Sequence, residues 1–502
     1  MDLLNLVTLL NLRFPQHIKI YKFEENEVKQ ISLEELPKIE VELTDDSRQI
    51  RENSFYFSTY FSKPYLREAI QKNPIAIFLT KKELESISIP KSNTYFLVGK
   101  KKPDFYLGHC SSLFYEEPSK DQHIVAVTGT NGKTTTCFMI YHLWKKKQIA
   151  SAVIGTLGVY YWDGKEENQI PTGFTTPRAY ELQRILYFLR SKKIFFIVME
   201  ASSEALALKR LEGLYVQKAI FTNFSQDHLN FHKTMNHYFF AKLHLFFLTY
   251  RHSKEIFPFI VVYNHKTYRI FYRFSTLLNV TILYLLKSHL KYPFVKNISL
   301  NFEFNQWNAL CAYFGSRTKD CKYSLNDSPL SDFMGVAGRM EKISWGKALD
   351  IFIDYAHTPD ALKNVLEQLK KNYETILTVF GCGGDRDHEK RPIMGKISSL
   401  YSDYIFITDD NPRTEKPEEI RKSILMGIPE EKKNITFNIQ NREEAIKTCL
   451  NKGKELYKES SKSIAILIAG KGHENYQIIE KEKIYFSDKE IVLNHIKDQK
   501  LK

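Results

Sequence analysis

The sequence predicts an α/β protein of about three domains, and three observations support this fold class. Continuous apolar runs that suit buried strands alternate with stretches that suit helices, and the clearest runs are residues 124–127, 150–154, 194–199 and 219–222. This alternation is typical of a parallel sheet covered by helices on both faces. Several runs end in glycine or polar residues, and ligands bind beyond the carboxyl ends of such strands. A chain of 502 residues also accommodates about three domains of ordinary size.

We place the domain boundaries after residues 119 and 338. Residues 1–119 alternate short strand-like runs with charged turns, and the polar stretch 115–120 has the composition of a linker. Residues 120–338 contain the repeated pattern of strand and helix. Residues 339–502 contain three further apolar runs that end in polar strings, at 376–380, 404–408 and 464–469. Three such strand ends form a crevice that suits a small zwitterion.

The composition is that of a globular protein, with 43% hydrophobic residues and a formal net charge of +14. Half of that excess lies between residues 251 and 300, where eight Lys or Arg face one acid, Glu255. Tyr and Phe are interleaved with these charges, but no nucleic-acid recognition motif accompanies them. We therefore interpret this segment as a solvated basic face, and we expect no nucleic-acid partner. We also expect the protein to be a monomer.

The cysteines and the N-terminus both favour a cytoplasmic location without membrane contact. No C-x-x-C pair occurs among Cys110, Cys137, Cys311, Cys321, Cys382 and Cys449, which disfavours a disulfide framework or a zinc site. Asp2 stands where a signal peptide would carry a basic residue. The apolar stretch 276–286 is too short to cross a bilayer.

Residues 124–136 read as a strand, a glycine turn and the start of a helix, in the order of a phosphate-binding loop. The glycines let the backbone approach an anion, Lys133 adds a positive charge, and the Thr134 hydroxyl suits magnesium. Val127 stands where the longer P-loop pattern has another glycine, so the match is to the short form G-x-x-G-K-T. We expect ATP to contact Gly129, Thr130, Asn131, Gly132, Lys133, Thr134 and Thr135.

Two further polar groups follow strands of the predicted central sheet. Glu200 directly follows the run 194–199, where an ATPase needs a carboxylate for magnesium. Asp227 and His228 follow the run 219–222 after a short interval. These groups can hold a metal ion against Thr134, although a single Glu or His is more often structural.

Four strings in this sequence resemble the Mur ligase family, whose members form peptide bonds in bacterial cell-wall precursors and which has folylpolyglutamate synthetase as a relative. They are residues 128–135, 199–203, 221–232 and 351–362. The resemblance covers nearly the whole chain, and it is weakest before residue 40 and between 251 and 300. It implies a small N-terminal α/β domain that binds the UDP substrate (1–119), a central P-loop ATPase sheet (120–338) and a C-terminal Rossmann-like ligase domain that binds the amino acid (339–502).

On the nucleotide side, the resemblance implies that Asn305 and Asn308 lie near the adenine. It also implies that Arg339 and Asp354 reach ATP from the C-terminal domain. Independently of the resemblance, the string D-Y-A-H-T-P at 354–359 predicts a strand that enters a helix capped by Thr358, with Pro359 in its first turn.

Lys242 lies in the expected helix 238–246 and matches a lysine that several Mur ligases carry as a carbamate. Burial and nearby cations lower the pKa of a lysine, the neutral amine adds CO₂, and the resulting anion can bridge magnesium ions. The resemblance thus implies three catalytic residues, Lys133, Lys242 and His228. The metal ligands that it implies are Thr134, Glu200, His228 and Lys242.

For the UDP-muramoyl dipeptide, the resemblance implies two groups of contacts. Ser47 and Arg48 match a D-S-R segment that grips the uridine nucleotide. The peptide and sugar would contact Thr175, Thr176, Ser203 and Arg210. The sequence departs from the family pattern at Phe174, Glu204 and Leu208, where Asn, His and Gln are usual.

For the incoming amino acid, the string Asp410, Asn411, Pro412 and Arg413 resembles the motif of the branch that adds meso-2,6-diaminopimelate. A guanidinium can clamp the second carboxylate of that amino acid in a bidentate manner. Arg386, Gly470 and Glu474 match further contact positions, and Glu474 suits the distal ammonium. The expected reaction joins this amino acid to UDP-N-acetylmuramoyl-L-alanyl-D-glutamate through an acyl phosphate, with ATP and magnesium.

Three alternatives remain at this point. Folylpolyglutamate synthetase would need neither the motif at 410–413 nor an N-terminal uridine domain. A lysine-adding ligase would share everything except Arg413. A catalytically silent nucleotide-binding or nucleic-acid-binding descendant would suit the basic excess and the divergent segment 251–300.

Overall fold

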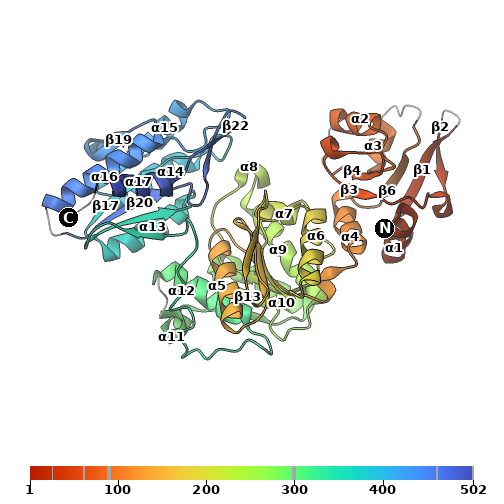
Figure 1. Ribbon diagram of the computed structural model, residues 1–502, viewed down its shortest axis with the longest axis horizontal. Helices are drawn as coiled ribbons and strands as arrows, with labels where there is room; N and C mark the ends of the chain where they lie inside the picture. Colours follow the sequence, from red (N-terminus) through yellow and green to blue (C-terminus); the bar gives the residue numbers. More distant parts are fainter. Residues whose placement is uncertain (25–26, 60–62, 87–91, 297–300, 460–461, 500–502) are drawn as a thin grey trace.

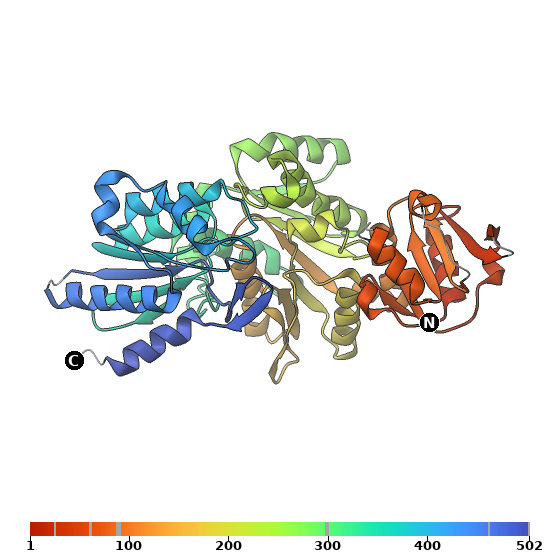
Figure 2. The same ribbon diagram turned by 90° about the horizontal axis from the view of Figure 1, so that it is seen from above.

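The structure is a computed structural model that describes residues 1–24, 27–59, 63–86, 92–296, 301–459 and 462–499. Three sheets with their helices lie in a row, and the N- and C-termini lie at opposite ends of that row (Figures 1 and 2). The N-terminal sheet adjoins the central sheet through α4 (Pro103–Phe114), and the C-terminal sheet lies on the other side. The α/β fold class predicted from the sequence is confirmed.

The N-terminal sheet has six strands in the order β2-β1-β6-β5-β4-β3. The pairs from β6 to β3 are parallel, whereas β1 is antiparallel to both of its neighbours. The buried rings of Phe55, Phe57 and Phe78 pack against one another in its core. The strands are β1 (Ile18–Glu24), β2 (Glu27–Ile31), β3 (Glu42–Thr44), β4 (Ser54–Phe57), β5 (Ala76–Leu79) and β6 (Tyr95–Gly99), with helices α1 (Leu3–Arg13), α2 (Lys63–Gln71) and α3 (Lys81–Ser86).

The central sheet has eight strands in the order β10-β9-β8-β11-β7-β12-β13-β14. All pairs from β8 to β14 are parallel, as the apolar runs predict, and β9 forms antiparallel pairs with β8 and β10. The strands are β7 (His123–Thr128), β8 (Ser151–Gly155), β9 (Gly158–Trp162), β10 (Glu167–Ile170), β11 (Phe196–Glu200), β12 (Val216–Phe221), β13 (Phe259–Val262) and β14 (Ile282–Leu285).

Helices cover both faces of the central sheet. On one face, the side chains of α5 (Lys133–Lys146) and α12 (Glu303–Ser316) pack into one hydrophobic core. On the other face, α6 (Ala179–Ser191), α9 (Met235–His252) and α10 (His265–Leu278) build a second core. Short helices complete this part of the chain: α7 (Ser203–Ala207), α8 (Leu229–His232) and α11 (Pro293–Lys296).

The divergent basic segment extends the central sheet, because β13, α10 and β14 form one strand–helix–strand unit. Its aromatic residues Phe259, Phe271 and Phe274 are buried in the core. All eight of its Lys and Arg residues are exposed, as expected for a solvated face. The end of the segment, residues 297–300, lies outside the described residues.

The C-terminal sheet has six strands in the order β15-β16-β20-β17-β18-β19, and β15 is the antiparallel edge strand. As expected, the Thr358 hydroxyl caps α13 by accepting a hydrogen bond from the Ala361 N–H at 3.2 Å. Its strands are β15 (Glu341–Ser344), β16 (Leu349–Asp354), β17 (Thr375–Phe380), β18 (Tyr404–Ile407), β19 (Thr436–Asn438) and β20 (Ile464–Ala469). The helices of this part are α13 (Pro359–Asn372), α14 (Lys390–Tyr401), α15 (Pro417–Leu425), α16 (Arg442–Glu459) and α17 (Asp488–Asp498). A separate two-stranded hairpin consists of β21 (Tyr476–Ile479) and β22 (Glu482–Tyr485).

All six cysteines are free thiols and are buried. Within the described ranges, no helix is long and apolar enough to cross a membrane.

A fully buried ion pair joins α16 to the start of α17. Arg442 donates from Nε and Nη2 to the two carboxylate oxygens of Asp488, both at 2.8 Å, and neither side chain is exposed. Arg442 Nη2 also donates to the carbonyl oxygen of Ala469, the last residue of β20, at 3.0 Å. This pair therefore ties two helices to the central strand that leads into the C-terminal crevice.

We predict that Arg442→Ala lowers the free energy of unfolding of the C-terminal sheet and its helices by about 3–5 kcal/mol, because Asp488 would be left as an unpaired buried charge. Chemical unfolding and hydrogen exchange in α16 and α17 measure this change. The control is Lys447→Ala on the same helix, which breaks a half-exposed pair with Glu443 and should cost less than about 1 kcal/mol. Equal losses of unfolding free energy in the two variants would show that the buried pair of Arg442 and Asp488 does not stabilise this part of the protein more than an exposed pair does.

Candidate active site

A cleft of about 1040 Å³ separates the central sheet from the C-terminal sheet, at the carboxyl ends of the strands of both. Most of the residues predicted from the sequence line it: Thr130, Asn131, Gly132, Lys133, Thr134, Thr135, Thr175, Thr176, Glu200, Ser203, Arg210, His228, Lys242, Asn305, Asn308, Arg339, Asp354, Arg386, Asp410, Asn411, Arg413, Gly470 and Glu474. Gly129 and Pro412 lie just outside this lining. Ser47 and Arg48 belong to the N-terminal sheet and are also outside it.

The P-loop adopts the turn that its glycines predict. Gly129 has a φ of +147° and Gly132 a φ of +83°, and both values favour glycine. A Cβ at Gly129 would collide with the Thr222 hydroxyl, and one at Gly132 with the Asn308 side chain. Lys133 then opens α5 and donates from Nζ to the carbonyl oxygens of Gly129 (3.0 Å) and Thr130 (2.8 Å). The ammonium group of Lys133 therefore lies against the backbone of the predicted phosphate-binding loop.

Glu200 and Thr134 meet at the base of the cleft. The Thr134 hydroxyl donates to Glu200 Oε2 at 3.0 Å, and the Thr156 N–H donates to Glu200 Oε1 at 2.8 Å. Glu200 is 1% exposed, so its carboxylate orientation is fixed by these two bonds. Arg339 of the C-terminal domain approaches the same hydroxyl, with Nη2 at 3.4 Å. A hydroxyl and a carboxylate oxygen in contact fit the preference of magnesium for oxygen ligands.

His228 has a different environment from Glu200, because both of its ring nitrogens face carboxylates. Nε2 lies 3.3 Å from Asp227 Oδ2, and Nδ1 lies 3.3 Å from Glu204 Oε1. Burial opposes ionisation of Asp227, but His228, His357 and Lys390 together lower its pKa to about 2. The described part of the chain contains no cluster of three or more His, Cys, Asp or Glu side chains arranged to hold a metal.

Lys242 lies on α9 beneath the P-loop and is 1% exposed. Its Nζ donates to the Gly129 carbonyl oxygen at 2.7 Å and lies 4.5 Å from the centre of the Tyr238 ring. Burial, and then the charge of Lys133, hold the pKa of Lys242 well below its usual value. The predicted metal set thus divides: Thr134 and Glu200 touch each other, His228 contacts two carboxylates, and Lys242 contacts the loop backbone.

Asn308 and Asp354 are both fixed by their neighbours. Asn308 Oδ1 accepts from the Thr136 hydroxyl, and its Nδ2 donates to Asn305 Oδ1, both at 3.3 Å. Asp354 accepts from the backbone N–H groups of Met340 (2.6 Å) and Ala356 (2.8 Å). Burial raises the pKa of Asp354 despite these bonds. Both side chains therefore lie at the cleft in fixed orientations.

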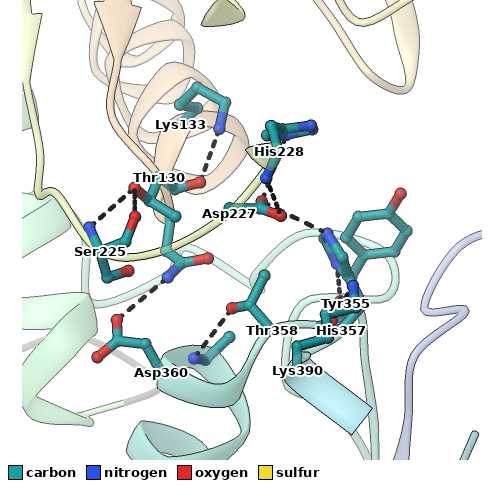
Figure 3. Close-up of polar contacts among 12 residues, drawn as sticks. Thr130, Lys133, Ser225, Asp227, His228, Tyr355, His357, Thr358, Asp360 and Lys390 are labelled. Atoms are coloured by element: carbon teal, nitrogen blue, oxygen red, sulfur yellow. Dashed lines mark hydrogen bonds and ion pairs between the residues drawn. The ribbon is translucent and has the colours of Figure 1, made fainter. Parts of the chain in front are cut away.

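Two contacts that the sequence did not predict join the P-loop side of the cleft to the C-terminal domain (Figure 3). Asn131 Nδ2 donates to Asp360 Oδ2 at 3.3 Å. His357 Nε2 lies 3.9 Å from Asp227 Oδ2, and its Nδ1 is held by the Tyr355 carbonyl oxygen at 2.8 Å. Asp360 and His357 both lie in the string 351–362, which the sequence alone singles out. Nothing in that string shows which partner each of the two side chains contacts.

The residues predicted to hold the peptide and sugar form one connected patch. The Thr176 hydroxyl donates to the Glu200 carbonyl oxygen (2.8 Å), and Arg210 Nη1 donates to the Thr176 carbonyl oxygen (3.0 Å). The Thr175 hydroxyl lies 3.2 Å from that of Thr156, and Ser203 Oγ lies 3.0 Å from His232 Nε2.

The departure at Phe174 has a physical explanation. The guanidinium carbons of Arg210 and Arg178 lie 4.7 and 5.6 Å from the centre of its ring, so the aromatic side chain packs with both cations. Leu208 is 39% exposed, and nothing in the structure explains it.

Ser47 and Arg48 lie in a short 3₁₀ turn, Ser47–Gln49, whose loop contacts the central domain. Arg48 forms a bidentate pair with Asp46, and the Ser47 hydroxyl donates to Glu68 at 3.1 Å. Next to them, Asp45 forms an ion pair with Arg178 at 2.7 Å. Arg178 lies two residues after Thr176 in the chain. This pair brings the D-S-R loop to the side of the patch that contains Thr176 and Arg210.

At the C-terminal crevice, Arg413 adopts a φ of +53° and donates from Nη1 to the Gly384 carbonyl oxygen at 2.8 Å. Its Nε and Nη2 have no hydrogen-bond partner among the described residues. Asn411 Nδ2 donates to Glu474 Oε2 at 3.0 Å. Gly470 has a φ of +112°, and a Cβ there would lie 2.6 Å from Asp410 Oδ2. Arg386 is exposed at the mouth of the crevice.

Comparisons with known proteins agree with this geometry. A family model described as the Mur ligase middle domain matches residues 127–312, and one described as the Mur ligase glutamate ligase domain matches residues 338–472. A UDP-N-acetylmuramoyl-L-alanyl-D-glutamate–2,6-diaminopimelate ligase of Clostridium botulinum is 34% identical over 92% of this chain and 96% of its own length. A protein of that name from Prochlorococcus marinus is 38% identical over 77% of this chain and 80% of its own length. A solved structure of such a ligase superposes with a TM-score of 0.56 at 27% identity, over 94% of this chain and 100% of the other.

We predict that Lys133→Ala lowers ATP-dependent turnover at least about 100-fold and leaves the fold intact, because it removes a phosphate-facing charge from a loop. Steady-state phosphate release and circular dichroism measure the two effects. Lys145→Ala is the control, since Lys145 lies near the other end of α5 in an exposed pair with Glu167. Turnover at the wild-type rate by a folded Lys133→Ala protein would refute the P-loop assignment.

Proposed function

The chain belongs to the Mur ligase family and is an ATP-dependent ligase, and from that premise we propose that it adds meso-2,6-diaminopimelate to UDP-N-acetylmuramoyl-L-alanyl-D-glutamate. The observation that carries this proposal is Arg413, whose guanidinium has two unused nitrogens in a crevice that opens onto the P-loop cleft. The relatives that bear this name match most of the chain and support the same substrate pair. We further propose that the reaction takes place in the cytoplasm, where ATP is available.

The proposed reaction begins at the P-loop. Amide formation from a carboxylate requires activation, and ATP supplies it by phosphorylating the side-chain carboxylate of the D-glutamyl residue. The amine of diaminopimelate then attacks the acyl phosphate, and phosphate leaves. Lys133 and the loop N–H groups offset the charge that moves during phosphoryl transfer. Magnesium, when bound, would neutralise phosphate charge, and Thr134 and Glu200 are the pair that best fits it.

Residues of the C-terminal domain complete the nucleotide side of the site. Arg339 adds a guanidinium within 3.4 Å of the Thr134 hydroxyl, at the position where phosphate oxygens are expected. Asp360 and His357 hold the C-terminal domain against the P-loop side of the cleft through Asn131 and Asp227. We propose that these contacts fix the amino acid relative to the activated carboxylate, because a reacting pair must be brought within contact distance.

Arg413 and Glu474 account for the choice of amino acid in this proposal. Diaminopimelate carries an ammonium and a carboxylate at its far end, and lysine carries the ammonium alone. The free Nε and Nη2 of Arg413 suit the carboxylate in a bidentate manner. Glu474, held by Asn411, suits the ammonium.

We also propose that Lys242 is carbamylated. Its lowered pKa favours the neutral amine, which is the form that adds CO₂. The carbamate would place a negative charge beside Lys133, whose side chain shares the Gly129 carbonyl oxygen with Lys242. The modification would thus replace repulsion between two buried amines by attraction.

The function is tested by incubating the protein with ATP, magnesium, UDP-muramoyl dipeptide and a panel of amino acids, with phosphate release and product mass as readouts. We expect product with meso-diaminopimelate. Phosphate release without any ligated product would contradict the proposal.

If Lys242 is carbamylated, Lys242→Ala should lose at least about 100-fold in kcat and regain part of it with added formate or acetate, which can occupy the place of the lost anion. Lys242→Arg, which keeps a cation but cannot form the carbamate, should be equally inactive and should not respond. Lys218→Ala provides a control at another buried lysine of the central domain. Undiminished activity of Lys242→Ala would show that this lysine is not modified for catalysis.

Arg413→Ala should lower kcat/KM for diaminopimelate roughly 30- to 150-fold, because a desolvated bidentate contact is worth ~2–3 kcal/mol. The KM for ATP should change little. Arg413→Lys keeps the charge without the planar fork and should restore only part of the loss. Kinetics with diaminopimelate and L-lysine decide the matter, and equal kcat/KM for both amino acids in the wild type would exclude the diaminopimelate assignment.

A further inference from the structure

Lys471 is a fully buried lysine beneath the amino-acid crevice that the function so far leaves unused. It follows Gly470 at the end of β20, and its side chain has an exposed fraction of 0%. Its Nζ lies 3.2 Å from Asn411 Oδ1, 3.6 Å from Glu474 Oε2 and 3.7 Å from Asp410 Oδ1. Three side chains predicted to hold the amino acid therefore converge on one buried ammonium.

These contacts fix the orientation of the Asn411 amide. Its Oδ1 accepts from two donors, the Lys471 ammonium at 3.2 Å and the Ile478 N–H at 2.9 Å. Because the oxygen faces these donors, Nδ2 must face Glu474, and it donates to Glu474 Oε2 at 3.0 Å. Lys471, Asn411 and Glu474 thus form a closed ring of contacts in which the lysine determines where the glutamate points.

Lys471 also sets the charge of the crevice. Burial and the neighbouring Asp410 both raise the pKa of Glu474, and Lys471 opposes them. Arg442 lies near the same carboxylates, but both of its bonds to a carboxylate go to Asp488. Among the described residues, Lys471 is the one cation within 4.0 Å of both Asp410 and Glu474. With it, these two carboxylates leave one negative charge in excess on their side of the crevice, which matches a single ammonium, while Arg413 supplies the cation for a carboxylate.

We propose that Lys471 is a positioning residue that determines amino-acid specificity: it orients Asn411 and Glu474 and limits the side of the crevice formed by Asp410 and Glu474 to one excess negative charge. This inference rests on the proposed function. Without the lysine charge, the side of the crevice formed by Asp410 and Glu474 would carry two negative charges. It would then favour an amino acid with a net positive far end, such as lysine, over the neutral far end of diaminopimelate.

The test compares Lys471→Met, which keeps the length of the side chain, with Lys471→Arg, which keeps the charge. For the Met variant we expect kcat/KM for diaminopimelate to fall roughly 10- to 100-fold, mainly through its KM. The ratio of kcat/KM for diaminopimelate to that for L-lysine should fall at least about tenfold. The KM for ATP should stay within about twofold, since the polar contacts of Lys471 among the described residues go to Asn411, Glu474 and Asp410. Lys471→Arg should preserve the ratio between the two amino acids.

The matched control is Lys218→Met, at a buried lysine of the central domain that contacts the Arg317 carbonyl oxygen. It should leave the amino-acid ratio unchanged. If Lys471→Met lowers kcat/KM equally for both amino acids, or raises the KM for ATP as much as that for diaminopimelate, Lys471 is merely structural and the inference is wrong. Wild-type protein that does not ligate diaminopimelate would instead refute the proposed function.

Glu474→Gln provides a second test that does not alter the buried lysine and is expected to fold. With Lys471 retained, this substitution removes the excess negative charge, so lysine should lose more kcat/KM than diaminopimelate. The ratio should therefore rise, in the direction opposite to Lys471→Met. A ratio that stays at the wild-type value in Glu474→Gln would overturn the role of crevice charge in specificity.

Discussion

The contact between the Thr134 hydroxyl and the Glu200 carboxylate is the point on which the rest of the site depends. Glu200 is the last residue of β11, and its two oxygens join the first turn of α5 to the residue that follows β8. Its carbonyl oxygen accepts from Thr176, and Arg339 reaches the same threonine hydroxyl. One strand end thus connects the P-loop, the patch around Thr176 and the C-terminal domain, because parallel strands of a sheet all end at the same edge.

Local sequence patterns predict the parts of this protein that depend on near neighbours in the chain. The P-loop turn follows from two glycines, and the cap of α13 follows from Thr358 and Pro359. Contacts between distant residues do not follow from spacing. The ion pair of Asp45 with Arg178 joins residues that are 133 positions apart in the chain. The hydrogen bond of Asn131 with Asp360 joins residues that are 229 positions apart. The basic segment illustrates the same limit, since its composition predicts an exposed face but not the two strands that it adds to the sheet.

The departures of this chain from the family pattern alter charge and packing in the cleft. Glu204 places a carboxylate 3.3 Å from His228 Nδ1, and the hydrogen bond from His228 lowers the pKa of Glu204. Since Asp227 faces the other ring nitrogen, the imidazole is held from both sides. Phe174 brings an aromatic ring against Arg178 and Arg210, which orients two guanidinium groups beside Thr176. Both residues thus orient basic side chains within the cleft.

Lys133 and Lys242 illustrate how the fold prepares its own chemistry. The Nζ atoms of Lys133 and Lys242 both donate to the carbonyl oxygen of Gly129, at 3.0 and 2.7 Å respectively. Two amines therefore share one acceptor beneath the loop. Two like charges so close together in a protein interior are unfavourable, and burial and Lys133 both depress the pKa of Lys242. Burial lowers the pKa of Lys133 as well, at the point where the loop passes into α5. Lys133 also donates to the Thr130 carbonyl oxygen at 2.8 Å, so the two lysines together hold the loop backbone at Gly129 and Thr130.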